Sequence, residues 1–384
     1  MSEDWQNAGF GIYVHWPFCE SKCPYCDFNS HVTANVDQAR WLKSYVSELE
    51  RYAALTPGRV VGSVFFGGGT PSLMLPETVD GILNTIRRLW PQANEAEVTL
   101  EANPGSIEAD RFRGYAMAGV NRVSMGFQAM NDRDLRRLGR LHSVKEAMAA
   151  FDIARNQFER VSFDLIYARQ DQTLPEWEAE LTRALDLAVD HLSLYQLTVE
   201  DGTAFGDRYK RGGLKGLPDQ DLAADMYELT QEVTAAAGLD CYEVSNHARD
   251  GARSRHNVLY WRYGDYIGVG PGAHGRVTLD GRRHATEAYR MPGDWLHRAE
   301  AGNADKLRDP LTGPEQAQEY LLMGLRLKEG IALSRFADLN GSALCQARMD
   351  ELVEMDLLKQ NNDLLAVTDQ GRMVLNAVLD KLLE

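Results

Sequence analysis

Cys19-Glu-Ser-Lys-Cys23-Pro-Tyr-Cys26 is a stretch of eight residues that carries three cysteines. Structural zinc sites are closed by four ligands, whereas iron–sulfur clusters are held by cysteine thiolates. Three close cysteines without a fourth therefore indicate a cluster in which one iron keeps an open position for an exchangeable ligand. Half of a zinc site, or three cysteines that are merely buried, are the alternatives.

The composition is that of a soluble globular protein. The chain has 384 residues, 44% hydrophobic and 25% charged, and this length favours a large domain plus a smaller one. A formal net charge of −15 repels phosphate backbones, so we expect no nucleic-acid partner. No apolar run is long enough for a bilayer, and the N-terminus is too polar for a secretory signal. Cys241 and Cys345 are isolated, so we expect no disulfide framework and a cytoplasmic location.

Short β-rich runs alternate with helix-length segments through the first half of the chain. Six runs are strand candidates: residues 11–15, 63–66, 97–101, 122–128, 161–167 and 191–197. Apolar residues recur at helical spacing in residues 37–52, 76–90, 144–157 and 176–189, and again in 219–237. Six βα units predict an α/β fold with a parallel sheet, either doubly wound or a partial barrel.

The last part of the chain has a different pattern of predicted helices and strands. Residues 315–327, 341–356 and 372–383 have helical patterns, and residues 364–367 read as a strand. We therefore predict two domains, a barrel with its extension over residues 1–275 and a small winged-helix-like domain over residues 276–384.

Polar residues and glycines end nearly every predicted strand. In a barrel these strand ends converge at the face where chemistry takes place. The groups at this face would be His15 and the cysteine loop, Gly67-Gly68-Gly69-Thr70, Glu101, Gln128 with Arg140 beyond it, Asp164 and Gln196.

The cysteine spacing, followed by a strand that ends in Gly-Gly-Gly-Thr-Pro, resembles the radical S-adenosylmethionine (SAM) superfamily. The resemblance implies a partial (β/α)6 barrel and a [4Fe-4S] cluster on Cys19, Cys23 and Cys26, with SAM on the open iron. It also implies a SAM site formed by Tyr13, Tyr25, Gly67, Gly68, Gly69, Thr70, Glu101, Gln128, Arg140 and Asp164. These residue types suit SAM, whose ribose diol matches a carboxylate and whose carboxylate matches an arginine.

Segments 191–200, 242–247 and 255–261 resemble the HemN/HemW branch of this superfamily. The oxygen-independent coproporphyrinogen dehydrogenases of this branch have a further cysteine where this chain has Phe28, and a longer extension than the 18 residues before Cys19. His256, Asn257 and Tyr260 resemble a motif associated with haem binding in the HemW type. The resemblance is therefore closest to HemW-type haem chaperones.

The implied function is to bind haem and deliver it to an acceptor protein, for example a membrane-associated respiratory protein. An external electron donor would reduce the cluster. One rival is a radical SAM dehydrogenase that decarboxylates coproporphyrinogen III, and another is a radical enzyme with an unrelated substrate. One segment departs from the family: Ala168-Arg-Gln-Asp-Gln172 replaces a Gly-x-Pro-x-Gln turn, which leaves the geometry of that loop open.

Overall fold

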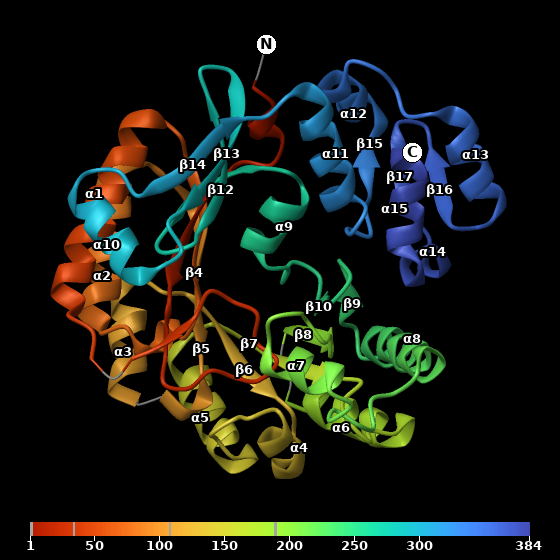
Figure 1. Cartoon of the computed structure of the whole chain (residues 1–384), viewed down its shortest axis with the longest axis horizontal. Helices are drawn as coiled ribbons and strands as arrows, with labels where there is room; N and C mark the ends of the chain where they lie inside the picture. Colours follow the sequence, from red (N-terminus) through yellow and green to blue (C-terminus); the bar gives the residue numbers. More distant parts are fainter. Residues whose placement is uncertain (1–2, 34, 107–108, 188–189) are drawn as a thin grey trace.

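Six parallel strands lie side by side in the same order as in the chain (Figure 1). The computed structural model describes residues 3–33, 35–106, 109–187 and 190–384. The strands are β1 (Phe10–Trp16), β4 (Val61–Gly68), β5 (Gln92–Ala102), β6 (Arg122–Gln128), β7 (Arg160–Tyr167) and β8 (His191–Gln196). A doubly wound sheet reverses its strand order at a switch point. The unbroken order here confirms the partial barrel.

The connecting helices cover the outside of the barrel. They are α1 (Gln38–Leu55), α2 (Pro76–Leu89), α3 (Ala109–Ala118), α4 (Asp132–Arg137), α5 (Val144–Gln157) and α6 (Leu174–Leu185). Sequence signals explain their starts, since Ser143 and Thr173 form capping boxes with Glu146 and Glu176. Helix α6 ends earlier than the predicted residue 189, and the last two residues of that prediction, 188 and 189, lie outside the described residues.

The two faces of the barrel strands differ in polarity. Ile12 and Val14 of β1 are buried in the main hydrophobic core together with residues of α1 and α2. Successive strand residues point to opposite faces, and the inward positions of β5 to β8 are mainly polar. These inward residues are Glu97, Thr99, Glu101, Arg122, Ser124, Arg160, Ser162, Asp164, His191, Ser193 and Tyr195. The barrel therefore encloses a polar interior, which we call the lumen.

Further strands extend the sheet at both edges; the one that joins β1 is parallel to it, and the others are antiparallel to their neighbours. Beyond β1 lie β11 (Asp265–Val269), β12 (His274–Leu279), β13 (Arg282–Ala288) and β14 (Asp305–Pro310), while β10 (Asn246–Ala248) and β9 (Asp240–Cys241) follow β8. The intervening helices are α7 (Ala204–Lys210), α8 (Gln220–Ala236), α9 (Arg255–Trp261) and α10 (Pro292–Glu300). The glycine-rich run 267–274 contains the end of β11, the turn after it and the first residue of β12.

The C-terminal part has its own small sheet and hydrophobic core. Its helices are α11 (Gly313–Gly324), α12 (Leu333–Asn340), α13 (Gln346–Glu354), α14 (Asp369–Met373) and α15 (Leu375–Leu383). Strands β15 (Ile331–Ala332), β17 (Leu364–Val367) and β16 (Leu358–Asn361) form an antiparallel sheet, as a β-wing requires. Helix α12 was not predicted, and α13 starts five residues later than expected.

The division between residues 1–275 and 276–384 stays a prediction. The large sheet continues through Pro310, and the second core is built from Ala317 onward together with Tyr263. We therefore propose a division closer to residue 311 than to 276.

Short elements complete the chain. They are three 3-10 helices, η1 (Asp4–Asn7), η2 (Pro71–Leu73) and η3 (Pro104–Ser106), and the strands β2 (Phe18–Cys19) and β3 (His31–Val32) of the cysteine loop. Within the described residues, no helix has both the length and the apolar character needed to cross a bilayer.

Candidate functional site

The cysteine loop leaves β1 at the C-terminal mouth of the barrel and is fixed by contacts from several distant segments. His15 Nε2 lies 2.9 Å from the Asn29 carbonyl oxygen. The Asn29 side-chain amide donates to the carbonyls of Pro271 and Arg290, at 2.9 Å each. The backbone N–H of Phe205 donates to the Pro24 carbonyl at 2.8 Å. The loop is therefore held from both sides of the barrel mouth.

The three thiols are unpaired and two of them face hydrogen-bond donors. Thr70 Oγ1 donates to Cys19 Sγ at 3.3 Å, and Arg140 Nη1 donates to Cys23 Sγ at 3.4 Å. Burial raises the pKa of the Cys19 thiol, and the Thr70 hydrogen bond partly offsets this effect. A hydroxyl and a guanidinium beside the sulfurs favour thiolates.

The arrangement of the thiols fits an iron–sulfur cluster. The three sulfurs lie near one another, since Cys23 and Cys19 both act to raise the pKa of Cys26, after the larger effect of burial. Iron–sulfur clusters are held by cysteine thiolates, each on a different iron. The donor set of Cys19, Cys23 and Cys26 therefore fits the predicted cluster.

The glycines after β4 let the chain pack closely on itself. A Cβ atom on Gly69 would lie 2.7 Å from the Phe18 carbonyl oxygen in the cysteine loop. Gly68 has a φ of 109°, and a Cβ there would lie within 2.9 Å of all three nearest atoms of the His15 ring. These glycines are needed for the close approach of the cysteine loop, in addition to any ligand contact.

Two acidic side chains, Glu101 and Asp164, lie in the upper lumen without a salt-bridge partner among the described residues. Burial, and then the charge of Asp164, raise the pKa of Glu101 to about 8. Burial likewise raises the pKa of Asp164 to about 6, although Ser124 Oγ donates to its carboxylate at 3.2 Å. Buried carboxylates short of cations form a site suited to a cationic ligand such as SAM.

The remaining predicted SAM residues surround the same mouth. Arg140 Nη2 donates to the Gly126 carbonyl at 3.0 Å, while its buried Nε has no partner among the described residues. Gln128 has a φ of 70°, an uncommon conformation for a non-glycine residue at the end of a strand. Tyr25 packs beside Phe205, and the Tyr13 hydroxyl lies 3.0 Å from His15 Nδ1. The structure thus brings the predicted cluster and SAM residues together.

The predicted haem residues lie elsewhere, on α9, which contacts β1 and β4 (Figure 1). His256 is only 3% exposed, and its Nδ1 lies 2.9 Å from Ser63 Oγ near the start of β4. Its ring packs against Phe65, Tyr13 and Tyr260, with ring centroids 5.2, 6.4 and 5.1 Å away. Burial lowers the pKa of His256 to about 3, so the imidazole is neutral.

His256 Nε2 is buried and has no hydrogen-bond partner among the described residues. A neutral imidazole with a free ring nitrogen is a suitable ligand for haem iron. The rings of Tyr13, Phe65 and Tyr260 enclose the imidazole in this conformation. Tyr13 contacts both His256 and His15, and thereby links α9 to the cysteine loop.

Glu97 is a site residue that the sequence did not reveal. Its Oε1 accepts from the backbone N–H of Arg255 at 2.9 Å and of His256 at 3.4 Å, at the N-terminus of α9. Its Oε2 accepts from Arg160 Nη1 at 2.8 Å. This carboxylate therefore fixes the haem-motif helix to the barrel. The sequence signal that could have identified Glu97 is its charge at an inward-facing position of a barrel strand.

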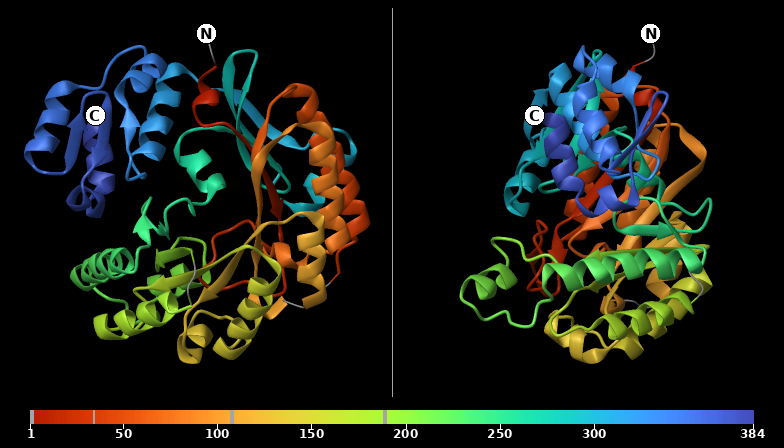
Figure 2. Two further views of the ribbon diagram at one scale, coloured as in Figure 1. Left: turned by 180° about the vertical axis from the view of Figure 1, so that it is seen from behind. Right: turned by 90° about the vertical axis from the view of Figure 1, so that its right-hand side faces the viewer.

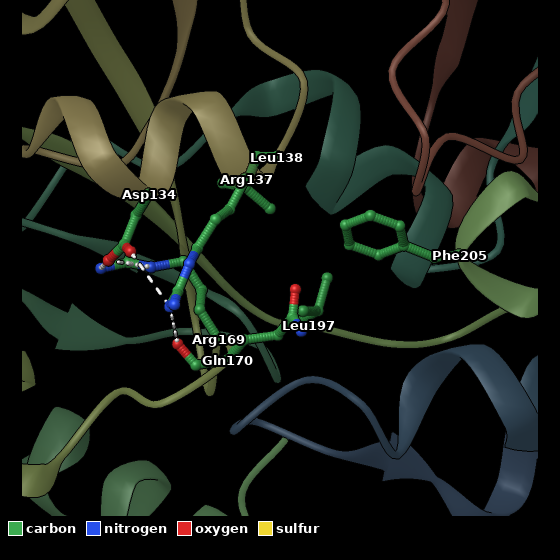
Figure 3. Close-up of a pocket in the computed structure, with 7 residues that line it drawn as sticks. All are labelled: Asp134, Arg137, Leu138, Arg169, Gln170, Leu197 and Phe205. Carbon is green, nitrogen blue, oxygen red and sulfur yellow. Dashed lines mark hydrogen bonds and ion pairs between the residues drawn. The ribbon is translucent and has the colours of Figure 1, made fainter. Parts of the chain in front are cut away.

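The unusual turn after β7 is stabilised by an arginine instead of the family glycine and proline. Arg169 is buried, with its Nη2 3.0 Å from Asp134 and also paired with Glu180. Figure 3 shows Arg169 and Asp134 lining a small pocket together with Phe205. Ala168 and Asp171 take positive φ values of 56° and 55°, so the turn keeps a left-handed backbone without glycine.

Two family models match the chain. The radical SAM superfamily model matches residues 13–183, and the HemN C-terminal domain model matches residues 311–374. The chain is 38% identical over 376 residues to "Heme chaperone HemW" of Escherichia coli K12, covering 96% of this chain and 97% of the relative. It is 37% identical to the HemW of Mycobacterium tuberculosis H37Rv, covering 97% and 95%.

A mitochondrial relative and a solved structure are also similar. "Radical S-adenosyl methionine domain-containing protein 1, mitochondrial" of Bos taurus is 39% identical, covering 97% of this chain and 87% of the relative. The structure of coproporphyrinogen III oxidase (HemN) from E. coli superposes with a TM-score of 0.82 at 21% identity, covering 99% of this chain and 91% of that one. At this identity the likeness shows a common fold.

Proposed function

Because the chain belongs to the radical SAM superfamily, in the branch of HemN and HemW, we propose that it is a haem chaperone that binds haem and passes it to an acceptor protein. The observation that carries this proposal is the placement of His256, a neutral imidazole whose Nε2 has no protein partner in the described chain, on a helix that contacts the barrel. Similarity over almost the full length to proteins named haem chaperones supports it.

The cluster and SAM belong to the proposal as resident groups. Cys19, Cys23 and Cys26 would hold the [4Fe-4S] cluster, which supplies one-electron reduction of a ligand on its open iron. Glu101 and Asp164 would accept hydrogen bonds from SAM, and Arg140 would bind its carboxylate. The hydroxyl of Thr70 and the guanidinium of Arg140 stabilise the thiolates, and the packed cysteine loop limits their contact with water.

The haem partners and the location are further parts of the proposal. We place the haem ligands His256 and Tyr260, with Asn257 beside them, on α9. Delivery requires an acceptor, for which a membrane-associated respiratory protein is the candidate, and cluster reduction requires an electron donor. A cytoplasmic location suits oxygen-sensitive thiolates.

The proposal is tested with protein that carries its cluster, supplied anaerobically with SAM and a reductant, and with either haem or coproporphyrinogen III. We expect one haem retained per chain and no protoporphyrinogen. Repeated decarboxylation would instead establish the dehydrogenase and refute the chaperone.

The role of His256 is tested separately with the visible spectrum. His256→Ala should change the Soret band of the haem complex, because a nitrogen ligand of the iron is removed. The matched control is His297→Ala, since His297 is exposed on α10 and distant from the motif in the chain. Identical Soret bands for wild type and His256→Ala would remove His256 from the haem site.

A further inference from the structure

The lumen contains a buried arginine without a carboxylate partner. Arg122, the first residue of β6, is 3% exposed. Its Nη2 donates to Ser162 Oγ at 2.8 Å and lies 3.4 Å from His191 Nδ1. Within the described residues, no carboxylate oxygen lies within 4.0 Å of its guanidinium nitrogens. Arg122 therefore makes no direct ion pair, although its charge acts on Glu101 and Asp164 and counters the rise of their pKa values.

Three other buried arginines are paired, whereas Arg372, which is 6% exposed, also has no carboxylate partner among the described residues. Arg59 and Arg283 face Asp265, and Arg169 faces Asp134 and Glu180. Burying a charge costs several kcal/mol, about the amount that a close ion pair can offset. Arg122 therefore carries a cost that no local ion pair offsets. A ligand that brings a negative charge would remove this cost.

The side chains in direct contact with Arg122 are neutral hydrogen-bonding groups, while the charged Arg160 is its register partner on β7. Burial, and then the charge of Arg122, lower the pKa of His191 well below its usual value, so its ring is neutral. His191 Nε2 lies 2.9 Å from the Tyr242 hydroxyl, and Ser162 Oγ lies 3.0 Å from Ser124 Oγ. A guanidinium offers five N–H donors. In the described chain only Nη2 has protein partners, so donors on Nε and Nη1 remain free for a ligand.

This cluster lies between the two predicted sites. Through Ser162 and Ser124 it connects to Asp164 of the SAM site. Tyr242 lies beside Asn257 of the haem motif. Solvent reaches the lumen on the side of the SAM residues, since Tyr195 on β8 is 42% exposed and Asp164 is half-buried.

We propose that Arg122, with Ser162 and Tyr242, is the anchoring site for a carboxylate group of the ligand bound in the lumen. This inference rests on the proposed function, in which the ligand is haem and the carboxylate is one of its propionates. A carboxylate can accept two parallel N–H bonds from one guanidinium. Arg122 thus recognises the acidic side chains of the tetrapyrrole, while residues of α9 bind its iron.

The test compares haem with haem dimethyl ester, in which both propionates are neutral. Cluster-loaded wild-type protein is titrated with each, and binding is followed by the Soret band. We expect haem to bind at least about tenfold more tightly than the ester, because a hydrogen bond between charged groups is lost with the ester.

Variants assign that preference to Arg122. Arg122→Gln should bind haem and ester equally, at the affinity of wild type for the ester, and Arg122→Lys should recover part of the preference. Arg155→Gln, at an exposed position on α5, should behave as wild type. SAM binding by each variant reports whether the barrel mouth is intact.

The outcomes separate the two proposals. Equal affinity of wild-type protein for haem and ester would overturn the carboxylate anchor and leave the chaperone function standing. Equal weakening of both ligands by Arg122→Gln would show a structural role and would also overturn it. Failure of wild type to bind either ligand would refute the proposed function and this inference together.

Discussion

At the scale of single residues, Glu101 connects stability to ligand binding. Its folded-state pKa of about 8 lies above the ordinary value of 4.5, because burial and the neighbouring Asp164 disfavour its charge. The folded chain therefore holds this proton more tightly than the unfolded chain does. The stabilising contribution is complete below pH 4.5 and is lost as the pH rises through 8.

We predict that Glu101→Gln raises the melting temperature at pH 9, by about 2 °C or more, and changes it much less at pH 5. The same substitution should weaken SAM binding about tenfold or more at pH 8, because an ionic hydrogen bond to a cation is removed. Calorimetry in the absence of SAM measures the first effect and equilibrium binding the second. A variant less stable than wild type at pH 9 would contradict the assigned pKa.

Sequence and structure agree at single residues where the chemistry is local. The cysteine spacing and the run Gly67–Thr70 were recognisable because residues close together in the chain form each motif. Glu97 and Arg122 were not recognisable, because their roles depend on side chains contributed by residues 40 to 157 positions away in the chain. A sequence pattern shows that a strand residue is charged, but it does not show which partner it meets in the lumen.

At the scale of elements, α9 is a short helix whose position depends on one carboxylate. Seven residues are too few for a helix to be stable alone. Glu97 satisfies the N–H groups of Arg255 and His256 at its start, where helices also attract negative charge. We predict that Glu97→Gln speeds amide exchange in residues 255–261 about tenfold, because a hydrogen bond to a charged group is weakened.

The control for this helix is Glu95→Gln. Glu95 also bonds Arg255, but its side chain is 79% exposed, so the pair contributes little. Hydrogen exchange followed by mass spectrometry should therefore show a change for Glu97→Gln alone. If both variants protect residues 255–261 as wild type does, Glu97 does not hold α9.

The turn after β7 is a second element whose stability depends on one side chain, Arg169, in place of the glycine and proline of the family. Removing Arg169 leaves Asp134 and Glu180 buried without their cation, so we predict that Arg169→Ala lowers the free energy of unfolding by about 3–5 kcal/mol. Arg137→Ala should cost less than about 1 kcal/mol, since its pair with Asp171 is exposed. Urea denaturation compares them, and equal costs would show that the buried network does not stabilise the turn.

For the whole molecule, the sequence pattern predicted the parallel sheet and the family resemblance its partial barrel, but neither predicted the strands at the two edges. Each βα unit is a local pattern, and six in succession leave few arrangements. Strand β11 instead pairs with β1, more than 250 residues earlier in the chain, and its glycines resemble a loop. Such distant pairings leave no periodic signal in the sequence.

Contacts from the N-terminal segment connect the barrel to the C-terminal part. Figures 1 and 2 show the N-terminal residues beside β13 and the C-terminal elements. The Asp4 carboxylate accepts from Arg335 Nε and Nη2 of α12 at 2.7 and 2.8 Å, and lies 3.3 Å from Arg283 Nη2 of β13. Burial alone would raise the pKa of Asp4, but the hydrogen bond and charge of Arg335 outweigh it, so the pKa lies below 3.8.

A depressed folded-state pKa stabilises the fold above pH 3.8, and this contribution is lost as the pH falls through the folded-state value. We therefore predict that Asp4→Asn lowers the free energy of unfolding by about 1–3 kcal/mol at pH 7. Its cost should shrink as the pH falls through the folded-state pKa, because wild-type Asp4 then becomes protonated as well. Limited proteolysis should also cleave the connection between β14 and α11 faster in the variant.

The control is Glu300→Gln, which removes an exposed pair with Arg40 on the opposite side of the sheet edge and should change neither measurement. Equal stability of Asp4→Asn and wild type at pH 7 would show that the two parts are held together by their apolar contacts alone.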